Sequence, residues 1–218
     1  LPTIKADVIV SHLAITWRRL PALMAFRARH TTTRILHVEH TYTAGFTALN
    51  VTRRARFFTL LRSAYALFDT IVAVSIPQGD WMTRRGLVRR DSLRVIPPVV
   101  DLSRFRALAA PQGRPTVIGA IGRLHRQKGF DLLIEAFRAL PRQDIALHIH
   151  GTGPEEALLK ALAGGDDRIR FFGHGEAPDA IMANVDIVAM PSRWEAFGLV
   201  ALEARAARRP LLTSGVDG

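Results

Sequence analysis

The sequence contains no cysteine, which limits both the covalent links and the metal chemistry open to the protein. Disulfides and thiolate metal sites are excluded, and the composition favours a reducing compartment. No apolar run approaches the ~20 residues that a membrane-spanning helix needs. No signal peptide is visible, but the chain begins at Leu1 without a methionine, and a predicted strand lies near each end. We therefore interpret it as an excerpt whose true termini could carry targeting information.

Lysine is also scarce, since it supplies only three of the 30 basic residues. The net charge of +11 lies in the first half, where residues 1–110 hold 17 basic and 6 acidic side chains, whereas residues 111–218 hold 13 of each. A basic half of this kind could contact an anionic membrane, a nucleic acid or an anionic substrate, or reflect a general preference for arginine. The change in charge, at the Pro- and Gly-containing stretch 109–113, predicts a domain boundary between residues 110 and 111.

Short β-branched runs alternate with helix-length stretches along the chain. In the second half we predict strands at 116–121, 145–150, 169–172, 186–190 and 211–213, and helices at 131–140, 155–163, 177–183 and 199–207. The first half alternates less regularly, with strands at 7–10, 35–39, 70–74 and 93–96 and helices at 17–29 and 47–68. This order implies right-handed crossovers and doubly wound parallel sheets, and therefore an α/β fold.

The predicted helix at 47–68 combines an apolar side with a group of arginines. Its apolar residues include Leu49, Phe57 and Leu61, and the arginines are at positions 53, 54, 56 and 62. A basic amphipathic helix can lie on an anionic membrane surface. A solvated basic face is the alternative, and the sequence does not decide between them.

Polar or glycine-containing turns follow four of the strands predicted in the second half, at 122–129, 151–154, 173–175 and 191–198. In a doubly wound sheet, ligands bind outside the carboxyl ends of the strands. A glycine after a strand is ordinary turn chemistry when it stands alone. Four such turns at one edge of a sheet predict a binding site there.

The charged residues of these turns suit a diphosphate and a sugar. Arg123 and Lys128 place a forked donor and a point charge in one loop, which fits a diphosphate, although a solvated basic loop is the alternative. Residues 197–199 open a helix whose first N–H groups attract an anion. Glu195 precedes this helix and Glu203 lies within it, where each carboxylate could hold vicinal hydroxyls or be solvated.

Two runs in the second half resemble the donor domain of family-4 glycosyltransferases. One extends from Gly122 to Phe137, and the other includes Pro191 and Ser192 and the stretch from Glu195 to Ala204. The two glutamates show that family's spacing, and the turns at 151–154 and 172–173 are similar to its nucleotide-side turns. The resemblance implies a GT-B fold of two Rossmann-like domains, with residues 1–110 a partial acceptor-side domain and residues 111–218 a partial donor domain.

The resemblance is weaker in the first half. Residues 71–75 and 95–101 resemble the end of the family's acceptor domain, with Pro98 where an asparagine is usual. Residues 39–41 resemble a segment in which the family often has an active-site histidine, so His40 would reach the donor sugar or phosphate. His12 is a second candidate of this kind, and a structural role for either histidine is the alternative.

The resemblance also implies roles for single residues. Arg123 and Lys128 would neutralise the diphosphate leaving group, which removes the need for a metal. Glu195 would hold sugar hydroxyls and Glu203 the ribose. In agreement with a metal-independent reaction, the chain has no Asp-x-Asp motif, which metal-dependent glycosyltransferases use. The implied catalytic set is His40, Arg123, Lys128 and Glu195, and the implied donor-binding set is Gly122, Arg123, Lys128, Gly153, Gly173, Glu195, Phe197, Gly198, Leu199 and Glu203.

His148 and His150 point to one face of a predicted strand, as metal ligands can. No carboxylate or third histidine lies near them in the sequence, so we interpret them as buried or partnered side chains.

From this resemblance we predict a retaining, metal-independent glycosyltransferase without a cofactor. It would move a sugar from a UDP- or GDP-linked donor to a glycan or lipid-linked acceptor. We expect a cytoplasmic protein, with attachment to the inner face of the cell membrane an open possibility. A non-catalytic sugar-nucleotide-binding module is the alternative. A nucleic-acid partner is not expected, because the charge lies away from the motif-rich half and no nucleic-acid motif accompanies it.

Overall fold

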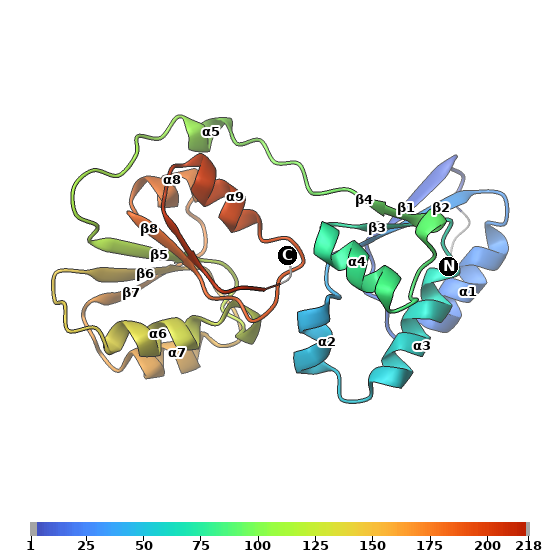
Figure 1. Cartoon of the computed structure of the whole chain (residues 1–218), viewed down its shortest axis with the longest axis horizontal. Helices are drawn as coiled ribbons and strands as arrows, with labels where there is room; N and C mark the ends of the chain where they lie inside the picture. Colours follow the sequence, from blue (N-terminus) through green and yellow to red (C-terminus); the bar gives the residue numbers. More distant parts are fainter. Residues whose placement is uncertain (1–3, 217–218) are drawn as a thin grey trace. The chain divides into compact units, whose positions relative to one another are not determined.

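Parallel strands that alternate with helices make up the computed structural model, which describes residues 4–216 (Figure 1). Contacts within the chain divide it into two units. Unit 1 consists mainly of residues up to 98, and unit 2 of residues 99–194 and 198–216. None of the helices in the described part of the chain is long and apolar enough to span a membrane.

Unit 1 is built on a parallel sheet with the strand order β1-β2-β3-β4. The strands are β1 (Val8–Ser11), β2 (Arg34–Glu39), β3 (Thr70–Ala73) and β4 (Leu93–Val95). Its helices are α1 (Leu20–Arg29), α2 (Ala44–Asn50), α3 (Arg54–Tyr65) and α4 (Ile76–Arg84), with a short 3-10 turn, η1 (Arg90–Ser92). The core between sheet and helices contains the fully buried side chains of Ile35, Leu61, Ile71 and Met82.

The helix predicted at 47–68 is two helices, so that prediction was wrong. Thr43 begins α2 by accepting a hydrogen bond from the backbone N–H of Phe46 at 3.1 Å, and the chain is extended at Val51 before α3 starts. Leu49 therefore does not share a helix face with Phe57 and Leu61, and it is 46% exposed. The prediction failed because the 3.6-residue spacing continues by chance across the break.

Helix α4 was missed, although the sequence carries signals for its start. The side chain of Ser75 accepts a hydrogen bond from the backbone N–H of Gln78, and Pro77 lies in the first turn. A serine cap followed by a proline is a typical helix start.

The arginines of α3 have different surroundings. Arg62 donates hydrogen bonds to the carbonyl oxygens of Gly86 and Arg85 at 3.0 and 2.9 Å, where α4 ends. Arg56 lies 5.3 Å from the centre of the Trp17 ring, in cation–π contact. The basic face is therefore partly used within unit 1, and membrane contact stays a prediction.

Unit 2 is built on a second parallel sheet, with the order β7-β6-β5-β8-β9. The strands are β5 (Val117–Ile121), β6 (Ala146–His150), β7 (Ile169–Gly173), β8 (Ile187–Met190) and β9 (Leu211–Thr213). Helices α6 (Phe130–Arg138) and α7 (Glu156–Ala163) lie on one side of it, and α8 (Pro178–Ala183) and α9 (Leu199–Ala206) on the other (Figure 1). The predicted α/β fold with two parallel sheets is thus confirmed.

The strand order of unit 2 determines where a ligand can bind. The chain adds β6 and β7 on one side of β5 and then returns to add β8 and β9 on the other. The connections after β5 and β8 therefore lead away from each other, and ligands of doubly wound sheets bind at the carboxyl ends of strands with such an arrangement.

The segment between the two sheets packs on unit 2. Helix α5 (Ser103–Arg106) contacts α8 and α9, and Phe105 is buried among Met182, Val188 and Ala204. Contacts group residues 99–110 with unit 2. The domain boundary between residues 110 and 111 stays a prediction.

Candidate functional site

The four turns that follow β5, β6, β7 and β8 are joined by backbone hydrogen bonds. The N–H of Gly122 donates to the carbonyl of His150 at 3.0 Å, and the N–H of Leu124 donates to that of Thr152 at 2.9 Å. The turn after β7 is joined to the turn after β6 by the hydrogen bond from the N–H of Gly151 to the carbonyl of Gly173. The turn after β8 joins the first one where Arg193 donates to the carbonyl of Gln127 at 2.7 Å. The structure therefore brings together the turns that the sequence places after these strands.

Glycine is required where the first two turns touch. A Cβ atom on Gly153 would lie 2.2 Å from the carbonyl oxygen of Leu124, and one on Gly151 would lie 1.9 Å from that of Gly122. Both distances are far below van der Waals contact, and Gly151 also has a φ of +139°. Backbone atoms thus pack directly on backbone atoms, as the close approach of a chain to a ligand or another chain requires.

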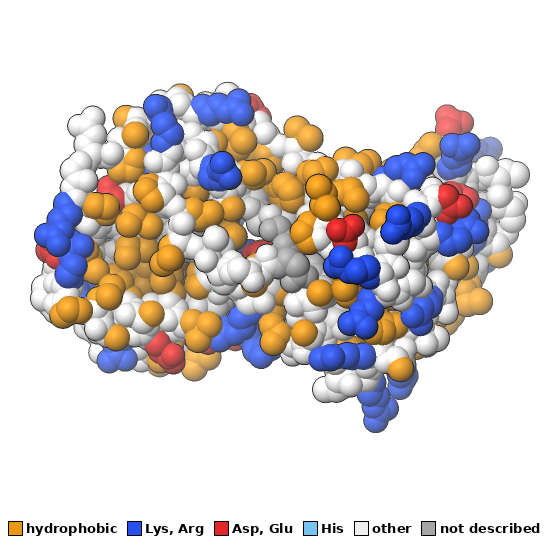
Figure 2. Space-filling view, in the orientation of Figure 1, with side chains coloured by type: hydrophobic (Ala, Val, Ile, Leu, Met, Phe, Trp, Pro, Cys, Tyr) orange, Lys and Arg blue, Asp and Glu red, His pale blue; other side chains and the backbone are white. Residues whose placement is uncertain are grey.

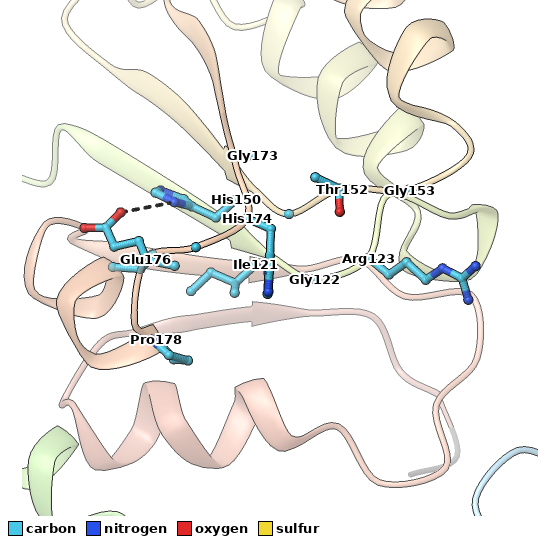
Figure 3. A pocket seen from close by; sticks show the side chains of 13 residues that line it. Ile121, Gly122, Arg123, His150, Thr152, Gly153, Gly173, His174, Glu176 and Pro178 are labelled. Atoms are coloured by element: carbon cyan, nitrogen blue, oxygen red, sulfur yellow. Dashed lines mark ion pairs between the residues drawn. The ribbon is translucent and has the colours of Figure 1, made fainter.

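A cavity of about 640 Å³ lies along the turns after β5, β6 and β7 (Figure 3). Its floor is largely the backbone of five glycines, and Arg123, Thr152, His174 and Glu176 add polar side chains. Ile121, Pro178 and Ile181 add apolar surface. A cavity of this size with a few convergent polar groups is typical of a small-molecule or nucleotide site.

His150 and Glu176 are features of this cavity that the sequence analysis did not identify as site residues. The carboxylate of Glu176 lies 3.7 Å from Nδ1 of His150, and the His150 ring stacks on Phe172 with the ring centres 4.6 Å apart (Figure 3). Within the described residues, Nδ1 of His150 is buried and has no hydrogen bond. Burial lowers the pKa of His150, and the nearby Glu176 only partly opposes this, so the ring is neutral at neutral pH.

The interpretation of His148 and His150 as buried or partnered side chains describes His150 well. It is 6% exposed, whereas His148 is half-buried and packs on Phe172. Among the residues that the structure describes, no group of three histidines or carboxylates is arranged to hold a metal ion. The signal that could have identified Glu176 is its place directly after the glycine turn 173–175, which follows a strand.

Arg123 and Lys128 both belong to the loop between β5 and α6. Arg123 is exposed and lines the cavity, at the opposite side of the lining from Glu176 (Figure 3). Lys128 ends a short 3-10 turn, η2 (Arg126–Lys128), and its side chain lies along Gly122, where a Cβ atom would be 3.3 Å from the Lys128 Cε atom. The two cations therefore lie on the loop that forms one wall of the site.

This loop is attached to the turn after β8 by an ion pair that the sequence analysis missed. Arg193 donates two hydrogen bonds to the Asp131 carboxylate, at 2.7 and 2.6 Å, and a third to the carbonyl of Arg126 at 2.9 Å. The hydrogen bonds from Arg193 hold the pKa of Asp131 below its usual value. A bidentate pair of this kind has a defined geometry, so it orients the loop that bears Arg123 and Lys128.

The second set of candidates lies in the turn after β8 and in α9. Gly198 precedes α9 in the left-handed conformation, with a φ of +75°, and Phe197 and Leu199 flank it. Glu195 lies in the turn, and Glu203 lies in the second turn of the helix. Burial raises the pKa of Glu203, which agrees with its apolar neighbours in the sequence.

His40 lies in unit 1, directly after β2, and hydrogen-bonds to His12 at 2.8 Å. It is therefore at the carboxyl edge of its own sheet, where a ligand of an α/β protein binds. Of the other candidates, Gly122, Gly153 and Gly173 line the cavity in unit 2. The roles assigned to all these residues remain predictions.

Two parallel-sheet α/β units, the second with a binding edge of this kind, place the protein in the GT-B class. Among solved structures, the Anabaena protein HepE in complex with UDP matches with a TM-score of 0.76, over 97% of this chain and 60% of that one, at 20% identity. WaaG, a glycosyltransferase involved in lipopolysaccharide biosynthesis, matches with a TM-score of 0.69, over 95% of this chain and 68% of that one, at 20% identity. At identities this low, the match shows that the folds are similar and nothing more.

The chain belongs to the family of glycosyl transferases group 1, whose family model matches residues 104–218. The model of glycosyltransferase family 4 matches residues 1–104. The family resemblance seen in the sequence is therefore confirmed.

Curated relatives extend this comparison. A D-inositol 3-phosphate glycosyltransferase of Saccharomonospora viridis is 33% identical over 174 residues, which are 69% of this chain and 40% of that protein. A lipopolysaccharide core biosynthesis mannosyltransferase of Rhizobium meliloti is 38% identical over 137 residues, which are 58% of this chain and 38% of that protein. The chain thus spans about two fifths of the length of these relatives.

Proposed function

We propose that the protein transfers a sugar from a nucleotide-diphosphate sugar to a glycan or lipid-linked acceptor, with retention and without a metal or cofactor. The observation that carries this proposal is the cavity of unit 2, which is lined by the turns after β5, β6 and β7 and by Arg123, with Lys128 on the same loop as Arg123. The relatives named as glycosyltransferases, and the neighbour whose structure contains UDP, support the same reaction class.

In this proposal the donor diphosphate lies against the β5–α6 loop. Arg123 offers paired N–H donors and Lys128 a compact positive charge, and both stabilise the charge that develops as the diphosphate leaves. The ion pair between Arg193 and Asp131 keeps this loop in place before the substrate binds. Fixed cations beside the leaving group would take over the role that a metal has in other transferases.

The turn after β8 and the start of α9 would hold the rest of the donor. The backbone N–H groups at Phe197, Gly198 and Leu199 are the donors that a sugar or phosphate oxygen would meet at a helix start. Glu195 would accept hydrogen bonds from the sugar hydroxyls and Glu203 from the ribose. With retention, the acceptor oxygen bonds to the anomeric carbon on the face that the diphosphate leaves, and the acceptor proton passes to the departing phosphate.

The basic unit 1 would face the acceptor side. Arginine and lysine side chains are spread over the face of this unit drawn in Figure 2. This charge supports an anionic acceptor or attachment to an anionic membrane surface. We accordingly place the protein in the cytoplasm, with contact to the inner membrane face as part of the proposal.

Nucleotide diphosphates test the donor site directly in the full-length protein. UDP or GDP should raise the melting temperature, because a ligand at 100 times its Kd adds about 2.7 kcal/mol to the unfolding free energy. R123A and K128A should abolish most of this shift. R142A and K160A change the same residue types at a partly exposed and an exposed position of unit 2 that do not line the cavity, and they should keep the shift.

Two results would separate the alternatives. A full-length protein that is stabilised by a diphosphate but transfers no sugar from any donor would be a binding module. If neither diphosphate changes the melting temperature while DNA raises it with a steep salt dependence, the transferase proposal is wrong.

A further inference from the structure

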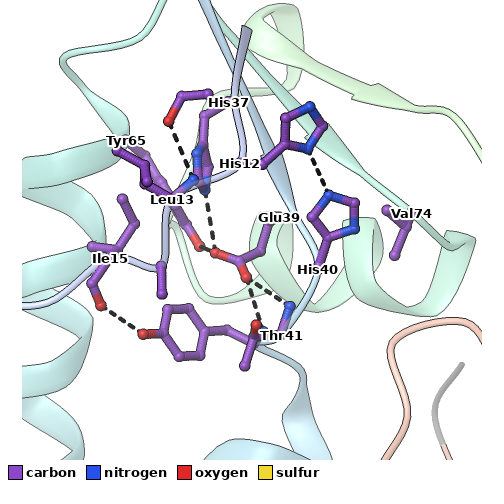
Figure 4. Close-up of polar contacts among 12 residues, drawn as sticks. His12, Leu13, Ile15, His37, Glu39, His40, Thr41, Tyr65 and Val74 are labelled. Carbon is purple, nitrogen blue, oxygen red and sulfur yellow. Dashed lines mark hydrogen bonds and ion pairs between the residues drawn. The ribbon is translucent and has the colours of Figure 1, made fainter.

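Two histidines that lie far apart in the sequence meet at the carboxyl edge of the sheet in unit 1. His12 follows β1 and His40 follows β2, and these strands are parallel neighbours. Nδ1 of His12 lies 2.8 Å from Nε2 of His40, and the rings are stacked with their centres 5.1 Å apart (Figure 4). Both side chains are exposed, so a ligand can reach the pair.

A buried carboxylate fixes the backbone around His40. Glu39 is 2% exposed and accepts hydrogen bonds from the backbone N–H groups of Thr41 and Tyr42, at 2.8 and 3.1 Å. The hydroxyl of Tyr65 donates to the same carboxylate at 2.9 Å (Figure 4). The peptide that carries His40 is therefore held from both sides, and only the ring orientation and the proton positions of His40 remain to be set.

The side-chain amide of Gln78 adds a second support to this peptide. Its Nε2 atom donates to the carbonyl oxygens of Glu39 and Tyr42, at 3.2 and 3.0 Å, and its Oε1 atom accepts from the N–H of Val74 at 2.8 Å. Gln78 is fully buried. The loop that carries His40 is thus attached to β3 and α4 as well as to β2.

The contact between the two rings limits where their protons lie. A hydrogen bond between imidazoles needs one N–H and one bare nitrogen, so the two facing nitrogens share one proton. The outward nitrogen of His40 is then Nδ1, which makes no hydrogen bond within the described residues. If His12 is the donor, Nδ1 of His40 carries a hydrogen, and if His40 is the donor, Nδ1 is bare.

Burial and the neighbouring charges lower the pKa of His40, so the ring is neutral at neutral pH. Burial and then the neighbouring His12 lower the pKa of His40, His37 lowers it further, and Glu39 opposes them. These three titratable groups act on the ring from the end of β1 and from β2. A neutral His40 has one N–H, and the position of that hydrogen decides whether the ring donates to a ligand or accepts from it.

We propose that His12 is a positioning residue, which donates its Nδ1–H to Nε2 of His40 and so makes His40 present an Nδ1–H to an oxygen of the bound substrate. The inference rests on the proposed function, since the substrates of that reaction carry anionic oxygens, which only accept hydrogen bonds, and a ring that presents N–H suits such an oxygen. His12 itself does not touch the substrate.

Nitrogen NMR of the histidine rings tests this arrangement without any substrate. In the ¹⁵N-labelled full-length protein, the long-range ¹H–¹⁵N spectrum reports which ring nitrogen of His40 carries the proton. We expect Nδ1–H in the wild type. H12F keeps a ring at position 12 but cannot donate a hydrogen bond, so His40 should change to the Nε2–H form. The pKa of His40 should also rise, because His12 no longer lowers it.

H12N is the matched variant, because its amide nitrogen can occupy the place of Nδ1 and donate the same bond. H12N should keep the Nδ1–H form of His40, although the pKa of His40 also rises in this variant. H40F identifies the His40 signals. If His40 is in the Nε2–H form in the wild type, or if H12F leaves its tautomer unchanged, the inference is wrong.

Kinetics of the full-length enzyme give the second readout. H12F should lower kcat/KM by about threefold to tenfold, the effect of one lost neutral hydrogen bond, and H12N should restore most of it. Equal losses in H12F and H12N would contradict a tautomer effect. If the wild type transfers no sugar at all, the proposed function fails, while the NMR result still decides the proton arrangement.

Discussion

Single charged side chains at the edge of unit 2 have different tasks, and their surroundings separate them. Arg193 and Asp131 join the turn after β8 to the first turn of α6 through paired hydrogen bonds at 2.7 and 2.6 Å. Glu203 has the opposite situation, because burial raises its pKa. The charged form of one carboxylate is thus stabilised by its partner, whereas burial disfavours the charged form of the other.

Asp131→Asn should lower stability by about 1 kcal/mol near neutral pH, a usual value for a partly exposed ion pair. The folded-state pKa of Asp131 is lowered, so its contribution is present above the unfolded pKa and disappears as the pH falls through the folded pKa. Urea unfolding of both proteins from pH 7 down to acid should show the difference shrinking. D167N changes an exposed aspartate of the same unit and should have no measurable effect on stability, and an equal loss in both variants would contradict this prediction.

Glu203→Gln should stabilise the protein at neutral pH and weaken nucleotide binding. A carboxyl whose folded pKa is raised binds its proton more tightly in the folded state, so the wild type loses stability as the pH rises from the unfolded pKa through the folded one. The gain from glutamine should therefore be present at pH 7 and vanish in acid. Thermal unfolding with and without diphosphate measures both effects, with the exposed E135Q as control. A destabilised E203Q at pH 7 would refute this.

At the scale of elements, the site is made by turns that touch rather than by one motif. The turns after β5 and β6 pack backbone on backbone at Gly151 and Gly153. The sequence predicts that glycine turns follow these strands, because a glycine run after a β-branched run is a local pattern. It does not predict that the turn at 151–153 lies against Leu124, since this depends on the strand order.

Gly153→Ala should separate these two turns. The added Cβ atom would lie 2.2 Å from the carbonyl oxygen of Leu124, so one turn must move, with an expected loss of about 1–3 kcal/mol. Diphosphate binding should weaken as well, because the cavity wall shifts. Gly215→Ala, where no atom lies within 4 Å of the added Cβ, is the control for unfolding and ligand titrations. Unchanged stability and affinity in G153A would show that the turn adapts without effect.

The two helices at 44–65 illustrate a limit of periodicity at this scale. Apolar spacing identified helical residues correctly but joined α2 and α3 into one helix. The break depends on the cap at Thr43 and the extended Val51, which apolar spacing does not register. Caps and breaks follow local hydrogen bonds, whereas the apolar pattern follows burial.

At the scale of the whole molecule, the chain contains two units with separate cores. The net positive charge is confined to residues 1–110, and the cavity described above belongs to unit 2. The segment 99–110 carries part of the positive charge, yet Phe105 is buried with Met182 and Ala204 in unit 2. Charge along the sequence and packing in space therefore divide the chain at different places.

Phe105→Ala should destabilise unit 2 rather than unit 1, by about 3–5 kcal/mol if the site does not collapse. Hydrogen exchange measured by mass spectrometry should show faster exchange in β5, β8 and α9, with β2 and β3 unchanged. Val99→Ala removes an apolar side chain that is 96% exposed and should change neither unit. Faster exchange confined to unit 1 in F105A would contradict this assignment.

The sequence by itself determined the α/β class, the positions of all the strands described here to within one or two residues, and the family, because these depend on local patterns of apolar, glycine and charged residues. Only the tertiary structure decided that Glu176 faces His150, that Arg193 holds Asp131, and that His12 meets His40. The two residues of these pairs are 26, 62 and 28 positions apart in the sequence, in the order given. Their contact follows from strand order and parallel register, which bring the carboxyl ends of distant strands to one edge.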